Sequence, residues 1–469
     1  MIIPAVEADT TETVHSRTAA KGGFMTKRII SLLLALTIVL GTTLALSSCA
    51  EFFFTISGSP SDGDGSGGET GGGDQNGGQS GGGQSGDGEG EPPVSFYPGS
   101  SDIDFSNVTA STRALLSSVA ITSHFKKTVD YGYSDPYYTE YKQYGSGVIY
   151  RIDREAGDAY IITNYHVVYH RDSSASDHLS TNIEVYLYGQ ESHPDTDTRS
   201  YPITATFVGG SMTYDIAVLR IEDSEVIRNS IAMPIEAGDS DELCVMDPVI
   251  AIGNAEGYGI SATEGIVSID NEELEIQAAD GYTTLMMRVM RISASINDGN
   301  SGGGLFTPDG KLAGIVVARR IATSTYEETE NIAYAIPGNL AINLVDNIIH
   351  YCAGSLNSNV FKCTLGFTPR ASARGVTVDP ETGKVRKVEL VAVSSIENGA
   401  LITGLLEIGD VINSVTVDGV TKEVTRVHHL LNHMITARVG STVVLSVTRG
   451  EETFDVTVVT TNECLKSVK

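Results

Sequence analysis

Three residues of this 469-residue chain have the side-chain types that together could hydrolyse an amide bond: His166, Asp215 and Ser301. Such a reaction needs a base that takes the serine proton, a carboxylate that orients the base, and N–H donors for the oxyanion. His166 lies in "AYIITNYHVV", at the end of the apolar run Tyr160–Thr163. The chain holds ten His, so the residue type alone says little. Its place at the end of a predicted buried strand makes His166 the candidate base.

Asp215 precedes an alternating apolar run in "TYDIAVLRI". An isolated Asp at this place is most often a cap at the start of a strand. The alternative is a carboxylate that orients an imidazole. Both interpretations stay open from this residue alone.

Ser301 lies in "NDGNSGGGL", and two interpretations compete for it. The same letters fill a spacer earlier in the chain, "GSGGETGGGDQNGGQSGGG". Here, however, the flanks are strand-like, "MMRVMRISASI" before and "LFTPDGKLAGIVVA" after. A tight loop between buried strands needs glycine for backbone with positive φ. In such a loop the N–H groups of Gly299 and Ser301 can converge as an oxyanion hole.

The elements that must position these residues are short apolar runs separated by Gly, Asn, Asp and Pro, from about 105 to 350. Many short strands at close spacing predict an all-β barrel or sandwich. Helical periodicity occurs only in "PGNLAINLVDNIIHY", where Leu340, Leu344 and Ile348 share one face. Residues 363–461 form a further unit, with a helix over 427–436 and a hairpin whose turn is at 449–451.

In its order of His, Asp and Ser, and in the motifs around them, the chain resembles a trypsin-like serine protease of the HtrA/Deg type. The motifs are "TNYHVV", "DIAVLRI" and "GNSGGGL", with "IGNAEGYGISATEGIVS" and "AYAIPGNL" as further matches. The resemblance implies a mostly β, chymotrypsin-like double barrel over residues 105–350. It assigns His166, Asp215 and Ser301 to the catalytic triad and Gly299 and Ser301 to the oxyanion hole. It implies neither a metal nor a cofactor.

Two positions depart from the family pattern. Asp298 stands where Pro is usual, and Gly304 where Pro or Ala is common. Both substitutions should loosen the turn beside Ser301. A carboxylate near the oxyanion hole is also unfavourable if it points inward.

By the same resemblance, the primary substrate pocket is lined by residues before the nucleophile and on the strand after it. These residues are Ser295, Ile296, Val317, Ala318 and Arg319. The uncharged Ser295 argues against a preference for Lys or Arg, and the apolar lining favours Val, Ala or Ile. Ordinary strand core is the alternative for Val317 and Ala318. A substrate would lie extended along the edge of this strand.

Residues 363–461 resemble a PDZ domain. The sequence "TLGF" matches the loop whose N–H groups capture a peptide carboxylate, which assigns peptide binding to Leu365, Gly366 and Phe367. The segment ending in "GDVI" recurs in these domains. His429 and His433, four residues apart, could bind a metal. Because no acidic or Cys partner is near them in the pattern, we favour a place on the helix surface or beside the peptide groove.

The N-terminus has the layout of an export signal. Residues 27–49, "KRIISLLLALTIVLGTTLALSSC", combine a basic start, an apolar stretch and small residues before Cys49. The ending resembles a bacterial lipobox, so we expect Cys49 to be lipidated and residues 1–49 to be an extension and signal peptide, with Met25 a plausible start. The alternative is an uncleaved membrane-spanning helix.

Residues 50–104 are a Gly/Ser/Asp-rich tether, and from residue 57 they are almost free of apolar side chains. We expect them to be disordered.

Charge and cysteines limit the remaining possibilities. The net charge of −28 repels phosphate backbones, so we expect no nucleic-acid partner. No CxxC pair occurs among the five Cys. Cys352 and Cys363 are the best candidates for a disulfide, with buried free thiols as the alternative.

Together these features predict a lipid-anchored extracytoplasmic serine endopeptidase that acts on unfolded or misfolded exported proteins and binds peptide C-termini. By resemblance it could be a trimer. The rival hypothesis is a latent protease domain in a protein that works mainly as a peptide-binding protein or chaperone.

Overall fold

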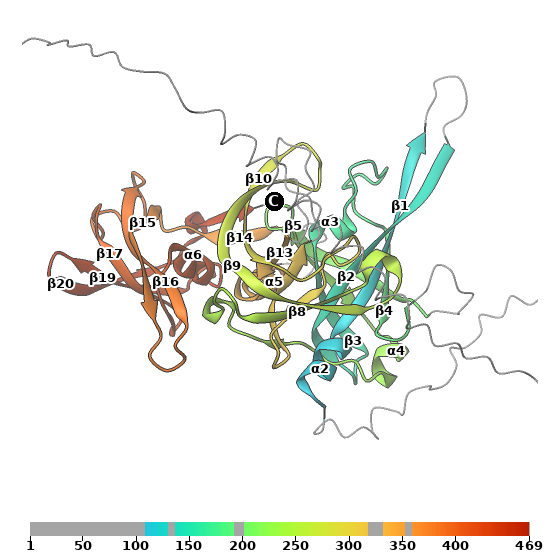
Figure 1. Ribbon diagram of the computed structural model, residues 1–469. Helices are drawn as coiled ribbons and strands as arrows, with labels where there is room; N and C mark the ends of the chain where they lie inside the picture. The colour runs from blue at the N-terminus through green and yellow to red at the C-terminus, as the bar shows by residue number, and fades with distance from the viewer. Residues whose placement is uncertain (1–107, 130–136, 192–200, 318–331, 352–358, 469) are drawn as a thin grey trace, which may run out of the picture. The chain divides into compact units, whose positions relative to one another are not determined.

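The structure is a computed structural model that describes residues 108–129, 137–191, 201–317, 332–351 and 359–468 (Figure 1). All of them belong to one compact unit, residues 88–469. The predicted signal peptide with Cys49 and the predicted tether lie outside the described residues. Within these ranges, no helix combines the length and the apolar character needed to cross a membrane.

The first half of the described chain closes into a six-stranded barrel (Figure 1). Its strands are β1 (Ser118–Val129), β2 (Tyr137–Asp153), β3 (Asp158–Thr163), β6 (Ile216–Ile221), β5 (Ile203–Ser211) and β4 (Asn182–Leu187), in that spatial order. Alternate residues of these strands face inward, as the period of a strand requires. Val119, Ile121 and Ile161, each fully buried, belong to this core. The short helices α2 (Ala110–Leu116), α3 (Tyr165–Val168) and α4 (Glu225–Asn229) belong to the same half of the chain.

A second group of strands forms another ring. Its strands are β11 (Gly304–Phe306), β8 (Pro248–Gly253), β9 (Ser261–Gln277), β10 (Thr284–Ile292), β13 (Ala333–Pro337) and β12 (Lys311–Val317), with β7 (Glu236–Ala237) added at β12. Because β11 pairs with both β8 and β12, the ring is closed. Two 3-10 turns, η3 (Ser240–Glu242) and η4 (Ala255–Gly257), lie between these strands in the chain. The predicted double β-barrel is confirmed.

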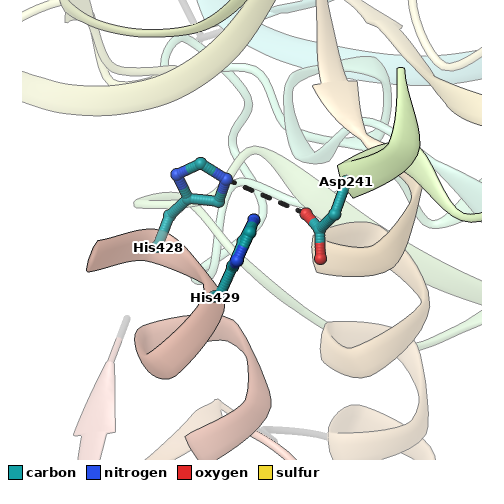
Figure 2. A group of neighbouring side chains, drawn as sticks. All are labelled: Asp241, His428 and His429. Carbon is teal, nitrogen blue, oxygen red and sulfur yellow. Dashed lines mark ion pairs between the residues drawn. The ribbon is translucent and has the colours of Figure 1, made fainter. Parts of the chain in front are cut away.

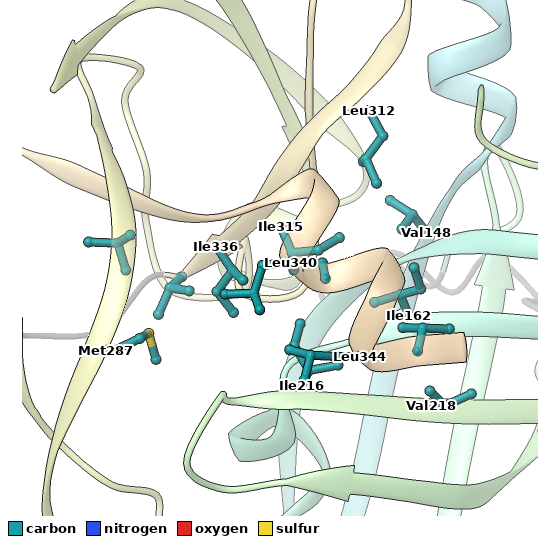
Figure 3. Packing of buried hydrophobic residues seen from close by; sticks show 14 of the residues in the cluster. Val148, Ile162, Ile216, Val218, Met287, Leu312, Ile315, Ile336, Leu340 and Leu344 are labelled. Carbon is teal, nitrogen blue, oxygen red and sulfur yellow. The ribbon is translucent and has the colours of Figure 1, made fainter. Parts of the chain in front are cut away.

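A single hydrophobic cluster joins residues of both barrels to helix α5 (Gly338–Tyr351), as Figure 3 shows. Ile162 and Ile216 come from the first barrel and Ile315 from the second. Leu340, Leu344 and Ile348 are all buried in this cluster, so the predicted apolar face of the helix is confirmed. The cluster therefore packs the two barrels against each other and against α5.

The last part of the chain, residues 359–468, has its own core and sheet. The sheet runs in the order β15 (Phe367–Val378), β16 (Val385–Ile396), β17 (Val411–Val417), β19 (Thr442–Arg449) and β20 (Glu452–Val459), with β18 (Val420–Glu423) on β17. Strands β14 (Val360–Cys363) and β21 (Leu465–Val468) pair separately, and the 3-10 turn η5 (Asn462–Cys464) precedes β21. The helix is α6 (Val427–Met434), two residues shorter than predicted. The predicted hairpin turn after Arg449 is confirmed.

A paired carboxylate secures the turn before β17. Asp410 is 1% exposed and accepts 2.7 Å hydrogen bonds from Arg449 Nε and Nη2, one on each carboxylate oxygen. Its Oδ2 also accepts from the Glu407 backbone N–H. The hydrogen bonds from Arg449 hold the pKa of Asp410 below its ordinary value. This network gives the "GDVI" motif a structural role.

We expect Asp410→Asn to lower the free energy of unfolding of this part of the chain by about 2–3 kcal/mol, because Arg449 loses a charged acceptor. A carboxylate whose pKa is lowered by folding stabilises the protein above its unfolded pKa, near 3.9, and that stabilisation is lost as the pH falls through the folded pKa. The difference between variant and wild type should therefore shrink in acid. Urea unfolding at pH 7 and pH 3 measures it, with exposed Asp455→Asn as the control. An equal loss at both pH values would contradict the assignment.

The predicted Cys352–Cys363 disulfide is wrong. Cys363 is a buried free thiol in the core of the last sheet, as are Cys244 and Cys464 at their sites. Burial raises the pKa of the Cys363 thiol to about 12, with Cys464 adding to the effect. Cys352 itself lies outside the described residues. The sequence offered the free-thiol alternative, and that alternative holds for these three residues.

Candidate active site

His166 follows β3 and Asp215 directly precedes β6. Because β3 and β6 are neighbouring strands of the first barrel, the two side chains lie close together. His166 Nδ1 lies 2.7 Å from Asp215 Oδ2, and the backbone N–H of His166 donates to Oδ1 at 3.0 Å. The carboxylate is 1% exposed and the imidazole 14% exposed. Two hydrogen bonds to one buried carboxylate fix both the ring and the backbone that carries it. The remaining ring nitrogen, Nε2, is the one that can exchange protons with a substrate or a nucleophile.

The backbone of Asp215 is left-handed, with φ of +52°. Asp tolerates this region better than most residues, although it costs energy there. The Asp215 carbonyl accepts a 2.8 Å hydrogen bond from Asn164 Nδ2, at the start of α3. Asn164 thus ties the helix that carries His166 to the turn that carries Asp215. The strand-cap interpretation of Asp215 does not account for these contacts, whereas orientation of His166 does.

Ser301 lies in the loop between β10 and β11, and its side chain is buried, 4% exposed. Its carbonyl accepts a 2.8 Å hydrogen bond from the Ser146 N–H. On the far side of the loop, Gly302 N–H donates to the Val316 carbonyl at 3.0 Å. The loop is therefore anchored on both barrels, and the spacer interpretation of "NDGNSGGGL" is wrong.

The peptide bond before Gly299 has a defined orientation. The Asp298 carbonyl accepts a 2.6 Å hydrogen bond from the Glu256 N–H. In a trans peptide the carbonyl and the following N–H point in opposite directions, and no peptide bond among the described residues is cis. The Gly299 N–H is therefore directed away from Glu256. Gly299 has φ of +90°, and a Cβ at this residue would collide with the Asn254 carbonyl.

Both residues that depart from the family pattern have defined contacts in or beside this loop. The Asp298 side chain is exposed, while its carbonyl makes the hydrogen bond described above. Gly304 belongs to strand β11, paired with both Ile252 and Ile315. A Cβ at Gly304 would enter the space of the Phe306 ring. The small residue at 304 is therefore a packing requirement of the strand.

Ser146, in β2, is a site residue that the sequence did not reveal. It is fully buried, and its Oγ donates to the Gly299 carbonyl at 2.6 Å and accepts from the Asn254 N–H at 2.7 Å. Its own carbonyl accepts from Thr163 Oγ1 at 2.7 Å. One serine thus connects the strand before His166 with the loop of Ser301. Only its position in "YGSGVIY", between glycines in a buried strand, could have hinted at this.

We expect Ser146→Ala to leave the Gly299 carbonyl and the Asn254 N–H without their buried partner, at a cost of about 1–3 kcal/mol in the free energy of unfolding. The Gly299 peptide should then lose its fixed orientation, so kcat for peptide hydrolysis should fall more than KM rises. Urea unfolding and initial rates measure the two effects. Exposed Ser176→Ala is the matched control. A variant with normal kcat but lowered stability would show that Ser146 supports the fold and not the loop.

The residues predicted for the substrate pocket fall into three groups. Ser295 is exposed, and its carbonyl accepts from Thr263 Oγ1 at 2.9 Å, whereas Ile296 is half-buried. Val317 is 4% exposed and packs in the cluster shared by the two barrels, in agreement with its alternative as strand core. Ala318 and Arg319 lie outside the described residues.

A cavity of about 570 Å³ opens beside the loop of Ser301. It is lined by residues of three segments, among them Tyr188, Glu191, Glu256, Tyr258 and Asn297. Glu256 is the residue whose N–H holds the Asp298 carbonyl. A polypeptide segment bound in this cavity would therefore contact Glu256, whose N–H orients the Gly299 peptide bond. Glu256 and Tyr258 lie in the motif "IGNAEGYGISATEGIVS" and Asn297 begins "NDGNSGGGL", but the sequence assigned none of the lining residues a role of its own.

The predicted peptide-binding loop of the last sheet leads into strand β15. Leu365 is buried, and Gly366 has φ of +82°. The Gly366 carbonyl accepts from the Glu397 N–H at 2.8 Å. Phe367 begins β15 opposite Ile396 of β16. The loop therefore bends at Gly366, just before β15 begins. One edge of β15 pairs with β16, and its other edge faces away from β16.

Comparison with known proteins agrees with this architecture. Residues 145–315 match the trypsin-like peptidase domain family. The serine protease Do-like HtrA of Lactococcus lactis subsp. cremoris is 29% identical over 297 residues, which cover 62% of this chain and 65% of that protein. The protein of the same name from Bacillus subtilis is 36% identical over 198 residues, 42% of this chain and 37% of that protein.

Among solved structures, HtrA-type protease AlgW with decapeptide is 24% identical, with a TM-score of 0.44 over 78% of this chain and 100% of that chain. The matched family covers the segments that hold His166, Asp215 and Ser301, and both curated relatives carry the same family name. Over residues 145–315 this chain therefore matches the trypsin-like peptidase domain family, and it is similar to serine proteases named HtrA, of which it spans less than two thirds of the length.

Proposed function

We propose that this chain is a serine endopeptidase in which Ser301 attacks the scissile carbonyl and His166 acts first as base and then as acid. Asp215 fixes the imidazole tautomer, and the Gly299 and Ser301 N–H groups hold the oxyanion. The observation that carries the proposal is the 2.7 Å contact between His166 and a buried Asp215. The outward Asp298 carbonyl adds to it, because it leaves the Gly299 N–H directed away from Glu256.

The proposed substrates are unfolded or misfolded exported proteins, cleaved beside small apolar residues. An extended chain is the substrate form that can pair with a strand edge, and unfolded proteins supply it. The uncharged Ser295 and the half-buried Ile296 favour Val, Ala or Ile next to the scissile bond.

The last sheet is the proposed peptide-binding PDZ domain. A cavity of about 1070 Å³ is lined by residues of β15, such as Ala371, and of α6, such as Val427, and also by residues of the second barrel, such as Met287. A cavity that touches both a strand and a helix suits a peptide that adds a strand to the sheet. Backbone N–H groups of Gly366 and Phe367, at the start of β15, would bind the peptide carboxylate.

The proposed location is outside the cytoplasm, with the chain anchored to the membrane by a lipid on Cys49. We expect Cys49→Ala to release the protein from the membrane fraction of expressing cells, because the variant lacks the side chain that would carry the lipid anchor. Fractionation and immunoblotting measure this. Membrane retention of the variant at the wild-type level would favour the membrane-spanning helix instead.

Association as a trimer is a further proposal, and light scattering would test it.

Cleavage of casein by the full chain, beside Ser301→Ala, tests the endopeptidase proposal. We expect turnover by the wild type and none above background by the variant. The rival function, a latent protease that works mainly by peptide binding, predicts equal rates for the two proteins, with and without C-terminal peptide activators. It rests on Asp298 and Gly304, and the hydrogen bond and packing described for these two residues weaken it.

A further inference from the structure

Three side chains of types that bind transition metals converge at one point, and none of them belongs to the candidate active site (Figure 2). Asp241 lies in η3, and His428 and His429 are consecutive in α6. One ligand atom from each of them lies within 4.8 Å of the other two. The His428 Nε2 atom is 3.9 Å from Asp241 Oδ1. Asp241 and the two histidines are separated by almost two hundred residues of chain, so only folding unites them.

The Asp241 carboxylate is buried, and only one of its two oxygens has hydrogen-bond partners among the described residues. Its side chain is 5% exposed, and Oδ2 is 2.9 Å from Lys422 Nζ and accepts from Asn339 Nδ2 at 3.0 Å. Among the described residues, Oδ1 has no hydrogen-bond partner. A buried carboxylate oxygen without a partner is costly. Its lone pairs are therefore available on the side that faces the two histidines.

The two imidazoles lie side by side in a buried place. Their ring centroids are 4.6 Å apart, and each residue is 8% exposed. His429 Nδ1 lies 3.3 Å from Thr425 Oγ1. A metal-binding histidine commonly donates its second ring N–H to a neighbouring acceptor, which fixes the tautomer. In the tautomer in which Nδ1 donates to Thr425 Oγ1, His429 Nε2 presents its lone pair to a metal.

The charges around the trio select among cations. Arg288 Nη2 is 3.9 Å from Asp241 Oδ1, and Lys422 occupies Oδ2. Burial lowers the pKa of Arg288 to about 10, so it is still a cation at neutral pH. Arg426 is a third cation near the two histidines. Ca²⁺ and Mg²⁺ bind oxygen ligands and would gain little here against these three cations. An ion that gains strong bonds from imidazole nitrogen, such as Zn²⁺, is the class that this donor set favours.

A path to the trio is present. Asp241 and His429 both line a cavity of about 400 Å³, together with Lys422 and Thr425. A hydrated ion could therefore reach the ligands from solvent and keep a water as a fourth ligand.

We propose that Asp241, His428 and His429 bind a divalent transition-metal ion of the Zn²⁺ class, which joins helix α6 to the segment between β7 and β8. Asn339 and Lys422 position the carboxylate through Oδ2, and Thr425 positions His429. The ion stabilises the docked arrangement of α6 by mass action, since only that arrangement offers all three ligands. This site is independent of peptide hydrolysis.

Titration of the chelator-treated full chain with Zn²⁺, followed by calorimetry, tests the proposal. We expect one saturable ion per chain, and at least tenfold weaker binding in Asp241→Asn and in His429→Gln. His433→Gln is the matched control, because His433 lies on the same helix but its Nε2 is 2.8 Å from the Val420 carbonyl. It should bind Zn²⁺ as the wild type does. No saturable binding to the wild type, or equal losses in all three variants, would overturn the proposal.

A measurement on the wild type alone guards against variants that fold poorly. X-ray absorption of the Zn²⁺-loaded chain should show two imidazole nitrogens and light oxygen or nitrogen donors around the ion. A first coordination shell with no imidazole, or one with sulfur, would assign the ion to another place and refute the site.

Discussion

Ser301→Ala is expected to lower kcat/KM for casein by about 10⁴-fold or more, because no other group can form the acyl-enzyme while the oxyanion hole and substrate contacts remain. The loss should fall almost wholly on kcat. Alanine fits the space of the buried Ser301 side chain, and the loop is held by backbone hydrogen bonds to Ser146 and Val316, so the fold should persist. Initial rates with a labelled casein measure the effect, and circular dichroism checks the fold.

Ser176→Ala provides the matched control for that experiment, since Ser176 is exposed and lies in the loop between α3 and β4. It should cleave casein at the wild-type rate. If Ser301→Ala retained more than about a hundredth of the wild-type rate, a nucleophilic serine at this position would be refuted, since residual catalysis without the nucleophile is far smaller.

Asp215→Asn is expected to lower kcat by about 10⁴-fold with little change in KM. The variant keeps the acceptor for the His166 backbone N–H in its side-chain oxygen. Its Nδ2 then faces His166 Nδ1 and donates to it, which forces the ring proton onto Nε2. That tautomer cannot accept the serine proton. Asn tolerates the left-handed backbone at this position, so the turn should keep its conformation.

Steady-state kinetics over a range of casein concentrations separates kcat from KM in this variant. The control is Asp309→Asn, an exposed carboxylate in the turn between β11 and β12. A loss of activity in Asp215→Asn that came entirely from weaker substrate binding would rule out an orienting role for Asp215. A variant that unfolded would instead show that Asp215 is mainly structural.

The contacts of Asp298 and Gly304 bear on whether the domain is active at rest. Both residues depart from the family pattern, and both were expected to loosen the loop. The structure shows instead a carbonyl held by Glu256 and a strand residue packed against Phe306. Cleavage by the wild type without an activating peptide would agree with a loop that is already oriented.

Local patterns were enough to predict much of this protein. Short apolar runs predicted many strands in a barrel or sandwich, the family resemblance implied the double barrel, and helical periodicity predicted the face of α5 that carries Leu340 and Leu344. The hairpin after Arg449 followed from its turn residues. His166, Asp215 and Ser301 were singled out as candidates because each has recognisable flanks, next to a strand for His166 and Asp215 and in a loop between strands for Ser301. Such features depend on neighbours within about ten residues, which the sequence lists directly.

Contacts between distant segments were decided by the tertiary structure alone. Ser146 became a site residue because β2 passes beside the Ser301 loop, and Cys363 is a free thiol because it lies within a core. The sequence placed His429 and His433 on the helix surface or beside the peptide groove, in preference to a metal site. His429 is buried and lies beside His428 and Asp241, because segments far apart in the chain pack together. The sequence by itself determined that the chain forms β-barrels and which residue types are available for catalysis. Tertiary packing decided which polar atoms face one another, because that depends on contacts between segments far apart in the chain.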